Sequence, residues 1–296
     1  MYDKVYIGTS IPMLFYIYFN LNKNENILII NKENYNGGSW FTISNKYCKD
    51  FDTAGHFIVI RNKKNLDKII SIFNDLQVEI GHQNAEIFNP NYKFINDSII
   101  LYPKNGWDKI TKSLIKKIGY NISYEKLVLN IDIQDNVKIK IKTKEGIVNI
   151  KTKKVIIPSY IKLDKIKIKN DIINLDYKLC NTYHVIFFCK INKNFKYNNS
   201  YHGFYKGDLI FDRLTCVCNT DKMNNISNVN QLLIFRISRK YKDDFLKMNN
   251  KKIIDNFFKF INEENIKMEK LQIKDISIFN YPFYYRQNNI KDLIEK

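Results

Sequence analysis

Short apolar runs and polar turns alternate over the first sixty residues in the order of a strand, a helix and a second strand. Residues 5–7 form an apolar run that stops at Gly8, and a polar turn then leads to Pro12. Proline suits the first turn of a helix, where its missing N–H leaves no bond unmade. A second apolar run follows at residues 27–30. The pattern predicts a strand–helix–strand unit whose helix N-terminus suits a phosphate.

The rest of the chain has two kinds of periodicity. Apolar residues recur at helical spacing in residues 64–81, 108–118 and 250–263, which predicts three amphipathic helices. In residues 137–150 lysine alternates with valine or isoleucine, and a turn falls at Lys144-Glu145-Gly146, which predicts a hairpin with one wet face. Residues 89–103 suggest a turn at Asn89–Pro90 and two short strands. From residue 162 on, the pattern predicts antiparallel strands joined by loops.

The turn after the first strand contains part of a nucleotide-binding fingerprint. In the pattern G-x-G-x-x-G, the three glycine positions are taken by Gly8, Ser10 and Met13. The second glycine normally lets the backbone approach a pyrophosphate and the third lets the helix pack closely on the strand. The Ser10 hydroxyl could donate to a phosphate, whereas Met13 should push the helix outward. The alternative is an ordinary strand-to-helix turn of any α/β fold.

The next segment, ILIINKENYNGGSW, resembles a segment of FAD-dependent oxidoreductases. In that family the second strand ends in an acidic residue that holds the adenosine ribose, and a Gly-Gly pair follows at the pyrophosphate and ribityl chain. Asn31 takes the place of the acid, and the pair is Gly37 and Gly38. Asn31 can still hydrogen-bond a ribose, but it loses a charged acceptor worth roughly 1.5–3 kcal/mol.

Two further blocks extend the resemblance. DFDTAGHFIVI resembles the segment of flavin amine oxidases that passes near the flavin, which would put Asp52, Gly55 and His56 close to the ring. In residues 122–161 a Val-x-x-Ile strand, a hairpin and a strand ending at Pro158 resemble the family's return to the cofactor domain, where the valine backbone, here Val128, meets the adenine. The similarity is to the superfamily of amine oxidases, protoporphyrinogen oxidases, phytoene desaturases and UDP-galactopyranose mutases. The family's C-terminal flavin-binding segment has no counterpart after residue 285.

This resemblance implies an α/β fold with a discontinuous Rossmann-like, FAD-binding domain at residues 1–61 and 100–161. A second, α+β substrate-side domain of mixed sheet and helices would cover residues 62–99 and 162–296. FAD is the implied cofactor. The implied cofactor-binding residues are Gly8, Ser10, Ile11, Asn31, Lys32, Gly37, Gly38, Ser39, Trp40, Gly55, His56 and Val128.

The implied function is that of a FAD-dependent oxidoreductase that removes a hydride from a C–N or C–C bond of an unidentified small molecule. The alternative is a catalytically inactive descendant that acts as a binding or scaffold protein. His56 is the one catalytic candidate; its other reading is an interior histidine, and no carboxylate partner for it is legible in the sequence. Instead of binding the cofactor, Lys32 could be an ordinary solvated lysine and Trp40 could be a core residue.

Composition favours none of the other classes of function. The formal net charge of the 296 residues is +18, but the lysines are scattered through strands and only five arginines are present. Lys, Asn and Ile are abundant and alanine occurs twice, which indicates an A/T-rich genome. We therefore do not expect nucleic acid as a partner, although a basic protein can bind it.

The five cysteines form no C-x-x-C pair and have no zinc-like spacing with the four histidines, so we expect reduced thiols and no metal site. The apolar run of residues 11–19 is shorter than the roughly twenty residues that span a bilayer. We see no signal peptide, and we expect a cytoplasmic protein. The sequence leaves the oligomeric state open.

Overall fold

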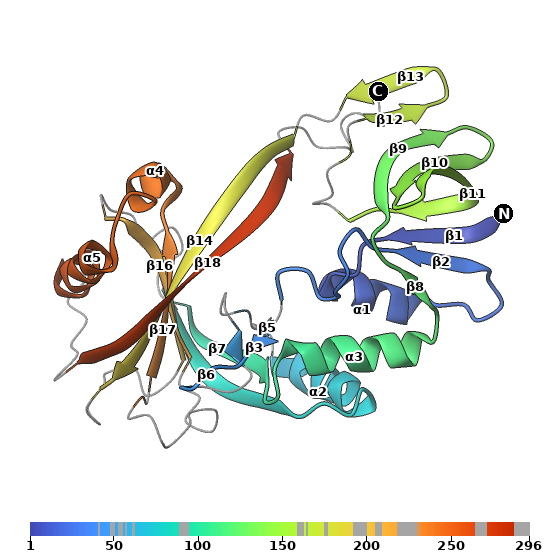
Figure 1. Cartoon of the computed structure of the whole chain (residues 1–296). Coiled ribbons are helices and arrows are strands. Elements are labelled where there is room, and N and C mark those ends of the chain that lie inside the picture. The colour runs from blue at the N-terminus through green and yellow to red at the C-terminus, as the bar shows by residue number, and fades with distance from the viewer. Residues whose placement is uncertain are drawn as a thin grey trace. The chain divides into compact units, whose positions relative to one another are not determined.

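The computed structural model describes residues 1–40, 42–47, 51–52, 56, 58–60, 63–88, 95–158, 163, 165–174, 177–191, 200–204, 209–217, 229, 231–263 and 271–286. The chain forms two compact units (Figure 1). Unit 1 consists of Met1–Ser39, Thr111–Asn181 and Pro282–Lys296, and unit 2 consists of Trp40–Ile110 and Thr182–Tyr281. Each unit is described by itself below.

Unit 1 is built on an eight-stranded sheet with the order β13-β12-β9-β10-β11-β1-β2-β8. At its centre β1 pairs in parallel with both β2 and β11, and β2 pairs in parallel with β8. This is the predicted Rossmann-like arrangement, with α1 (Ile11–Asn20) between the first two strands. The strands are β1 (Tyr2–Ile7), β2 (Ile27–Ile30), β8 (Ile122–Ser123), β9 (Leu127–Ile133), β10 (Val137–Thr143), β11 (Gly146–Ile156), β12 (Lys165–Ile168) and β13 (Asp171–Asn174).

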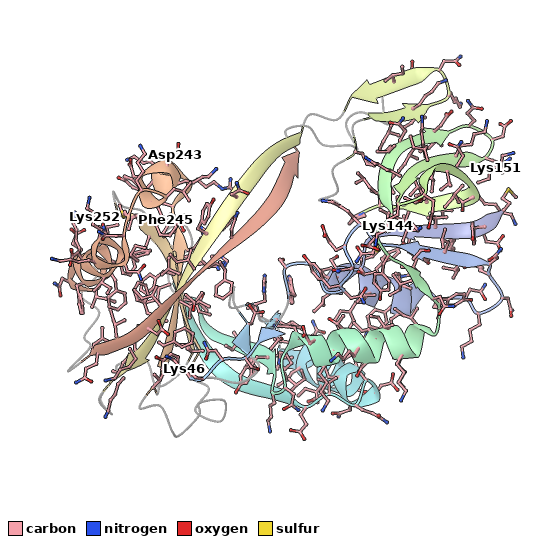
Figure 2. All side chains as sticks on the ribbon, viewed as in Figure 1. Lys46, Lys144, Lys151, Asp243, Phe245 and Lys252 are labelled. Atoms are coloured by element: carbon pink, nitrogen blue, oxygen red, sulfur yellow. The ribbon has the colours of Figure 1, made fainter. Side chains whose placement is uncertain are left out.

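The predicted hairpin of β10 and β11 is present, with its wet face. Val137, Ile139 and Ile141 are buried in the core of unit 1, while the lysines between them are exposed. Lys144 in the turn and Lys151 on β11 also lie at the surface (Figure 2). The lysine-rich alternation in this strand is therefore a solvent face of a sheet.

Unit 2 is built on a second eight-stranded sheet with the order β18-β14-β17-β16-β15-β6-β7-β5. Most neighbours are antiparallel, but β15 pairs with β6 in parallel, so the sheet is mixed as predicted. A separate two-stranded sheet joins β3 to β4. The strands are β3 (Thr42–Ile43), β4 (Phe51–Asp52), β5 (Ile58–Ile60), β6 (Ile80–Phe88), β7 (Ile95–Pro103), β14 (Tyr177–Lys190), β15 (Ser200–Phe204), β16 (Phe211–Val217), β17 (Gln231–Ile237) and β18 (Gln272–Arg286).

The core of unit 2 is aromatic. One face of β14, β16 and β17 packs against α5 (Asn250–Glu263), and the rings of Phe187, Phe211, Phe235, Phe257 and Phe260 contact one another there. Burial of so many rings makes this face the main hydrophobic cluster of the unit. The opposite face of the same strands is thereby left for other contacts. The short helix α4 (Lys242–Phe245) adds Phe245 to the cluster.

The predicted helices are present, and two of them have corrected bounds. α5 has the predicted bounds, and α3 (Trp107–Ile118) begins one residue early. The first of the three predicted amphipathic helices is shorter than predicted. After the short 3-10 turn Lys63–Asn65, this helix, α2, runs over Leu66–Asp75. Gln77 then adopts a φ of 55°, and N–H groups of Gln77 and Val78 donate to the carbonyls of Asn74 and Phe73. This Schellman cap ends the helix and frees the chain to enter β6.

The region after α2 also differs from the prediction of two short strands. β6 and β7 form one antiparallel hairpin of nine-residue strands, and the predicted turn at Asn89–Pro90 lies outside the described residues. Among the described helices, none is both long and apolar enough to cross a membrane.

The compact units divide the chain at other points than the predicted domain boundaries at residues 61, 99 and 161. Residues 40–61 and 100–110 fall in unit 2, where β5 pairs with β7, and residues 162–181 fall in unit 1, where β12 pairs with β9. The pairing of β5 with β7 and of β12 with β9 explains why these segments belong to those units. The elements α3, β14 and β18 have residues in both units.

Candidate functional site

The glycine turn of unit 1 is defined here as residues 8–10 together with Gly37 and Gly38. The N–H of Gly8 donates to the carbonyl of Ile30 at 2.7 Å, and the N–H of Gly37 donates to the carbonyl of Thr9 at 2.8 Å. Ser10 and Gly37 form a parallel bridge. Two segments more than twenty-five residues apart in sequence are thus held side by side at the start of α1.

Backbone conformation requires glycine in this turn. The φ angles of Gly8, Gly37 and Gly38 are 88°, 96° and 65°, in the region that L side chains rarely adopt. A Cβ on Gly38 would also lie 3.4 Å from the Cβ of Ser10, which is a tight contact. Glycine is therefore needed at these positions both for the positive φ angles and for the close approach of the two segments.

The start of α1 is suited to an anion. Ser10 is the N-cap residue, and its side chain makes no capping hydrogen bond. No acidic residue occupies the first turn of α1, so no carboxylate of the helix compensates the positive end of its dipole. Pro12 removes one N–H donor from that turn. Ile11 and Met13 are buried in unit 1, so both side chains turn away from solvent.

Asn31 lies at the carboxyl end of β2, as predicted, but its side chain has a local partner. The side chain is mostly buried, and its Nδ2 donates to the carbonyl of Tyr35 at 2.6 Å. Its backbone N–H donates to Ser123, and its carbonyl accepts from Lys126 at the approach to β9. The amide therefore fixes the loop that leads to the Gly-Gly pair, which is a role a carboxylate could not take at a carbonyl oxygen.

The other predicted cofactor-binding residues of unit 1 are Val128, Lys32 and Ser39. Val128 is buried on β9, two residues after the backbone contact of Lys126 with Asn31. Lys32 and Ser39 are exposed, and Lys32 Nζ lies 3.5 Å from the carboxylate of Glu33. The residues of the glycine turn fit the diphosphate of a dinucleotide, because bare backbone and a helix N-terminus meet there. Asn31 fits the ribose less well than an acid.

Unit 2 holds a second group of predicted residues, centred on His56. Its Nδ1 lies 2.9 and 3.1 Å from the two carboxylate oxygens of Asp52. The imidazole stacks on the indole of Trp40, with ring centroids 4.5 Å apart and an interplanar angle of 15°. His56 thus has a carboxylate partner, which was not legible in the sequence. Gly55 lies outside the described residues.

Trp107 anchors this group. Its Nε1 donates to the carbonyl of His56 at 3.1 Å, its ring meets Trp40 edge-on, and its backbone N–H donates to Thr42 Oγ1 at 2.8 Å. A Cβ on Gly106 would come within 2.5 Å of Thr42 Cγ2, and Gly106 has a φ of 76°. The glycine therefore lets the start of α3 approach β3 and hold the stacked rings in place.

A row of charged and polar side chains crosses three strands of the unit 2 sheet. His184 on β14 is in register with Arg236 on β17, which is in register with Arg213 on β16. Arg213 Nη2 lies 3.1 Å from His184 Nε2, so the imidazole accepts this bond through Nε2. Arg236 Nε donates to Asp212 Oδ1 at 2.6 Å. We call these four residues the arginine row.

Burial perturbs the titration of this row. Burial, followed by the fields of Arg213, His56 and Arg236, lowers the pKa of His184 to about 2. Burial and the like charge of Arg236 lower the pKa of Arg213 to about 10, although Asp212 and Asp52 oppose that shift. Arg213 is still cationic at neutral pH and His184 is neutral. These couplings also mean that Asp52 and His56 act electrostatically on the arginine row.

Sequence reasoning missed the arginine row. The available signal was a single polar residue inside a strongly apolar strand: His184 in YHVIFFC and Arg236 in LLIFRI. A polar side chain at such a position must find a partner or reach a site. Among the described residues, no three His, Cys, Asp or Glu side chains are grouped as a metal site would need.

The fold was compared with known proteins. No protein-family model matches the sequence, and no curated protein matches it. Solved structures do match: a protein assigned as a protoporphyrinogen oxidase from Exiguobacterium has a TM-score of 0.61 at 10% identity, covering 98% of this chain and 88% of that one. The chain has the fold of FAD-dependent oxidoreductases.

Two other structures share this fold. An aklavinone-11 hydroxylase, solved with FAD and aklavinone, has a TM-score of 0.53 at 10% identity and is matched over 97% of this chain and 55% of its own. RAB GDI from Plasmodium falciparum has a TM-score of 0.58 at 12% identity, over 97% of this chain and 90% of its own. The resemblance read from the sequence is thereby confirmed as a likeness of fold.

Proposed function

We propose that the protein is a FAD-dependent oxidoreductase that removes a hydride from a C–N or C–C bond of a small molecule. The observation that carries the proposal is the glycine turn of unit 1, in a chain whose fold is shared with a hydroxylase solved with FAD. Bare backbone at Gly37 and Gly38, bridged to Ser10, is the arrangement that a dinucleotide diphosphate needs.

In this proposal the chain holds FAD through unit 1. The N–H groups at the start of α1 and the Ser10 hydroxyl would bind the diphosphate, and Asn31 would reach the ribose. The backbone of Val128 would meet the adenine, as the family resemblance implies. FAD, when bound, supplies the hydride acceptor. The remaining chemistry, which is binding the substrate and moving a proton, falls to side chains of this chain.

Asp52 and His56 are suited to move that proton. An ionised Asp52 accepts a hydrogen bond from His56 Nδ1–H, which leaves the lone pair of the neutral imidazole on Nε2. Stacking on Trp40 fixes the plane of the ring. A histidine oriented in this way can take a proton from the N–H or O–H of a small molecule bound in unit 2. We expect the small-molecule chemistry to take place in the cytoplasm.

A second candidate function is that of an inactive descendant acting as a binding or scaffold protein. Asn31 favours it, because an amide bound to the Tyr35 carbonyl replaces the family's ribose-binding acid. Ser10 and Met13 in place of glycines point the same way. The likeness to RAB GDI shows that the fold also occurs in a protein whose name describes no oxidoreductase.

Equilibrium binding of FAD to matched glycine variants tests the proposal. Gly37→Val and Gly119→Val both place a branched side chain at a positive φ, of 96° and 71°, so both variants carry backbone strain. Gly119 has open space around it and lies outside the glycine turn. We expect Gly37→Val to abolish FAD binding and Gly119→Val to retain it. Equal FAD affinity in the two variants would contradict the placement of the cofactor at Gly37.

A further inference from the structure

Lysines of three strands gather on one face of the unit 1 sheet. On β10, Lys138, Lys140 and Lys142 alternate with the valine and isoleucines that enter the core, so all three point to the other face. Lys151 on β11 is the register partner of Lys138. Lys167 on β12 lies in the same row, with one residue of β9 between it and Lys138. We call these five residues the lysine face.

The lysine face makes no ion pair with a described residue. Its members on β10 and β11 are exposed, and Lys167 is half-buried. Asp132 lies between Lys138 and Lys167 in the row, but its Oδ2 accepts a hydrogen bond from Gln134 Nε2 at 3.5 Å. Other lysines of unit 1 do have a carboxylate within 2.7 Å: Lys4 has Glu25, Lys144 has Glu125 and Lys153 has Asp3. The described part of the chain therefore leaves the charge of the lysine face without ion pairs.

The strand register sets these charges against one another. Lys138 and Lys151 stand directly opposite each other on neighbouring strands, and like charges in such a pair destabilise a sheet. Along β10 the lysines follow at every second residue, roughly 6.8 Å apart, while neighbouring strands are about 4.8 Å apart. An anion whose charges repeat along its length would relieve this repulsion at several points, whereas a small anion would meet one or two of the lysines.

Asparagine amides lie beside the lysines. Lys140 has Asn130 of β9 and Asn149 of β11 as its register partners. Lysine and asparagine side chains are donors that proteins use for the phosphate oxygens of nucleic acids, and such contacts carry no sequence information. The rows of Lys138 and Lys140 contain no aromatic residue among these register partners. They therefore offer no stacking platform for bases, nor the aromatic anchors typical of a membrane interface.

We propose that the lysine face docks the phosphate backbone of a nucleic acid without reading its sequence. Lysines without acidic partners, interleaved with amide donors, match a polymer whose negative charges repeat along its length. The formal net charge of +18 attracts such a polyanion from a distance. Along the sequence these lysines look scattered, and only the strand register gathers them, so composition did not indicate this partner. Docking at this face requires neither FAD nor the oxidoreductase activity.

Fluorescence anisotropy of a labelled DNA duplex of about 20 base pairs, titrated with the full-length protein, tests the docking. If each of the five lysines neutralises one phosphate, the logarithm of the association constant should fall linearly with the logarithm of the salt concentration, with a slope of about −4.5. Two duplexes of unrelated sequence should bind equally, because the contacts are to the backbone. A duplex that does not bind at about 50 mM KCl, or a preference above about tenfold between the two sequences, would overturn the proposal.

Two triple variants with the same change of charge locate the binding. The face variant carries Lys138→Gln, Lys140→Gln and Lys142→Gln. The control carries Lys251→Gln, Lys252→Gln and Lys259→Gln, at exposed lysines of α5 in unit 2 (Figure 2). We expect the face variant to lower the magnitude of the salt slope by about 3 and to weaken binding at least about tenfold, and the control to change the slope by less than about 1. Equal losses in the two variants would mean that overall charge alone binds the duplex, which would overturn the proposal.

A change at a single lysine and a second probe complete the test. If circular dichroism shows that the face variant is unfolded, Lys140→Glu decides, because a reversed charge beside Lys138 and Lys142 should still weaken binding at least about tenfold. Wild-type affinity in a folded Lys140→Glu protein would refute the docking. Sedimentation with vesicles of phosphatidylserine and phosphatidylcholine is the parallel measurement. Protein that binds these vesicles through the lysine face but does not bind the duplex would assign the face to a membrane and contradict the proposal.

Discussion

His184 should make the stability of unit 2 strongly dependent on pH. The imidazole is 5% exposed, and burial together with Arg213 lowers its pKa to about 2, whereas a histidine in an unfolded chain titrates near 6.5. Below about pH 6.5 the unfolded state therefore binds a proton that the folded state does not. The stabilisation of the folded state by the neutral imidazole is complete above the unfolded-state pKa of about 6.5. It is lost as the pH falls below that value, at about 1.4 kcal/mol per pH unit.

A single substitution isolates this contribution. His184→Gln keeps an acceptor for Arg213 Nη2 but has no titrating group. Between pH 6.5 and 4.5 the wild-type protein should lose about 2 kcal/mol more free energy of unfolding than the variant. Both proteins contain the same other titrating groups, so the difference between the two pH profiles belongs to His184.

Urea unfolding followed by tryptophan fluorescence measures the effect. Both tryptophans lie in unit 2, so the signal follows the unit that contains His184. The midpoints of the wild type and the variant should diverge as the pH is lowered from 6.5 to 4.5. Parallel pH profiles would refute the reasoning, because they would mean that His184 takes up its proton equally in the folded and unfolded states.

Three further outcomes follow from the structure. Gly38→Ala should destabilise unit 1 more than Gly119→Ala, since both have positive φ but only Gly38 meets the Ser10 side chain; thermal unfolding by circular dichroism compares them. Phe257→Ala should cost about 3–5 kcal/mol in urea unfolding, because the ring is fully buried among other phenylalanines, and a loss under 1 kcal/mol would contradict that packing. Burial raises the pKa of the Cys189 thiol, so this cysteine should resist a thiol reagent in the folded protein and react with it after denaturation. Peptide mapping of the labelled protein measures this difference.

The sequence predicted those elements of the fold that produce a local pattern of hydrophobic and polar residues. Alternation predicted the hairpin of β10 and β11, and helical spacing predicted α5 with its bounds. The end of α2 was predicted too late, because Gln77 takes a left-handed conformation that sequence usually signals with glycine. Such a cap depends on backbone bonds that a hydrophobic pattern does not record.

The candidate sites could be predicted from the sequence only in part. Gly37 and Gly38 stood out because a glycine pair after a strand has few other uses, and the structure puts them beside Ser10. The partnership of Asp52 with His56 and the arginine row were not predicted. The arginine row depends on pairings between distant strands and on a bulge that shifts one side chain to the other face, which no local pattern encodes. Asp52 and His56 are only four residues apart, and the sequence singled out both residues but not their hydrogen bond.

The binding of FAD is the central claim, and the visible absorption spectrum of the purified full-length protein tests it most directly. We expect the bands of bound oxidised flavin, either as purified or after addition of FAD and removal of the excess. A folded protein that stays colourless after FAD is added would contradict the oxidoreductase and would favour the inactive descendant instead.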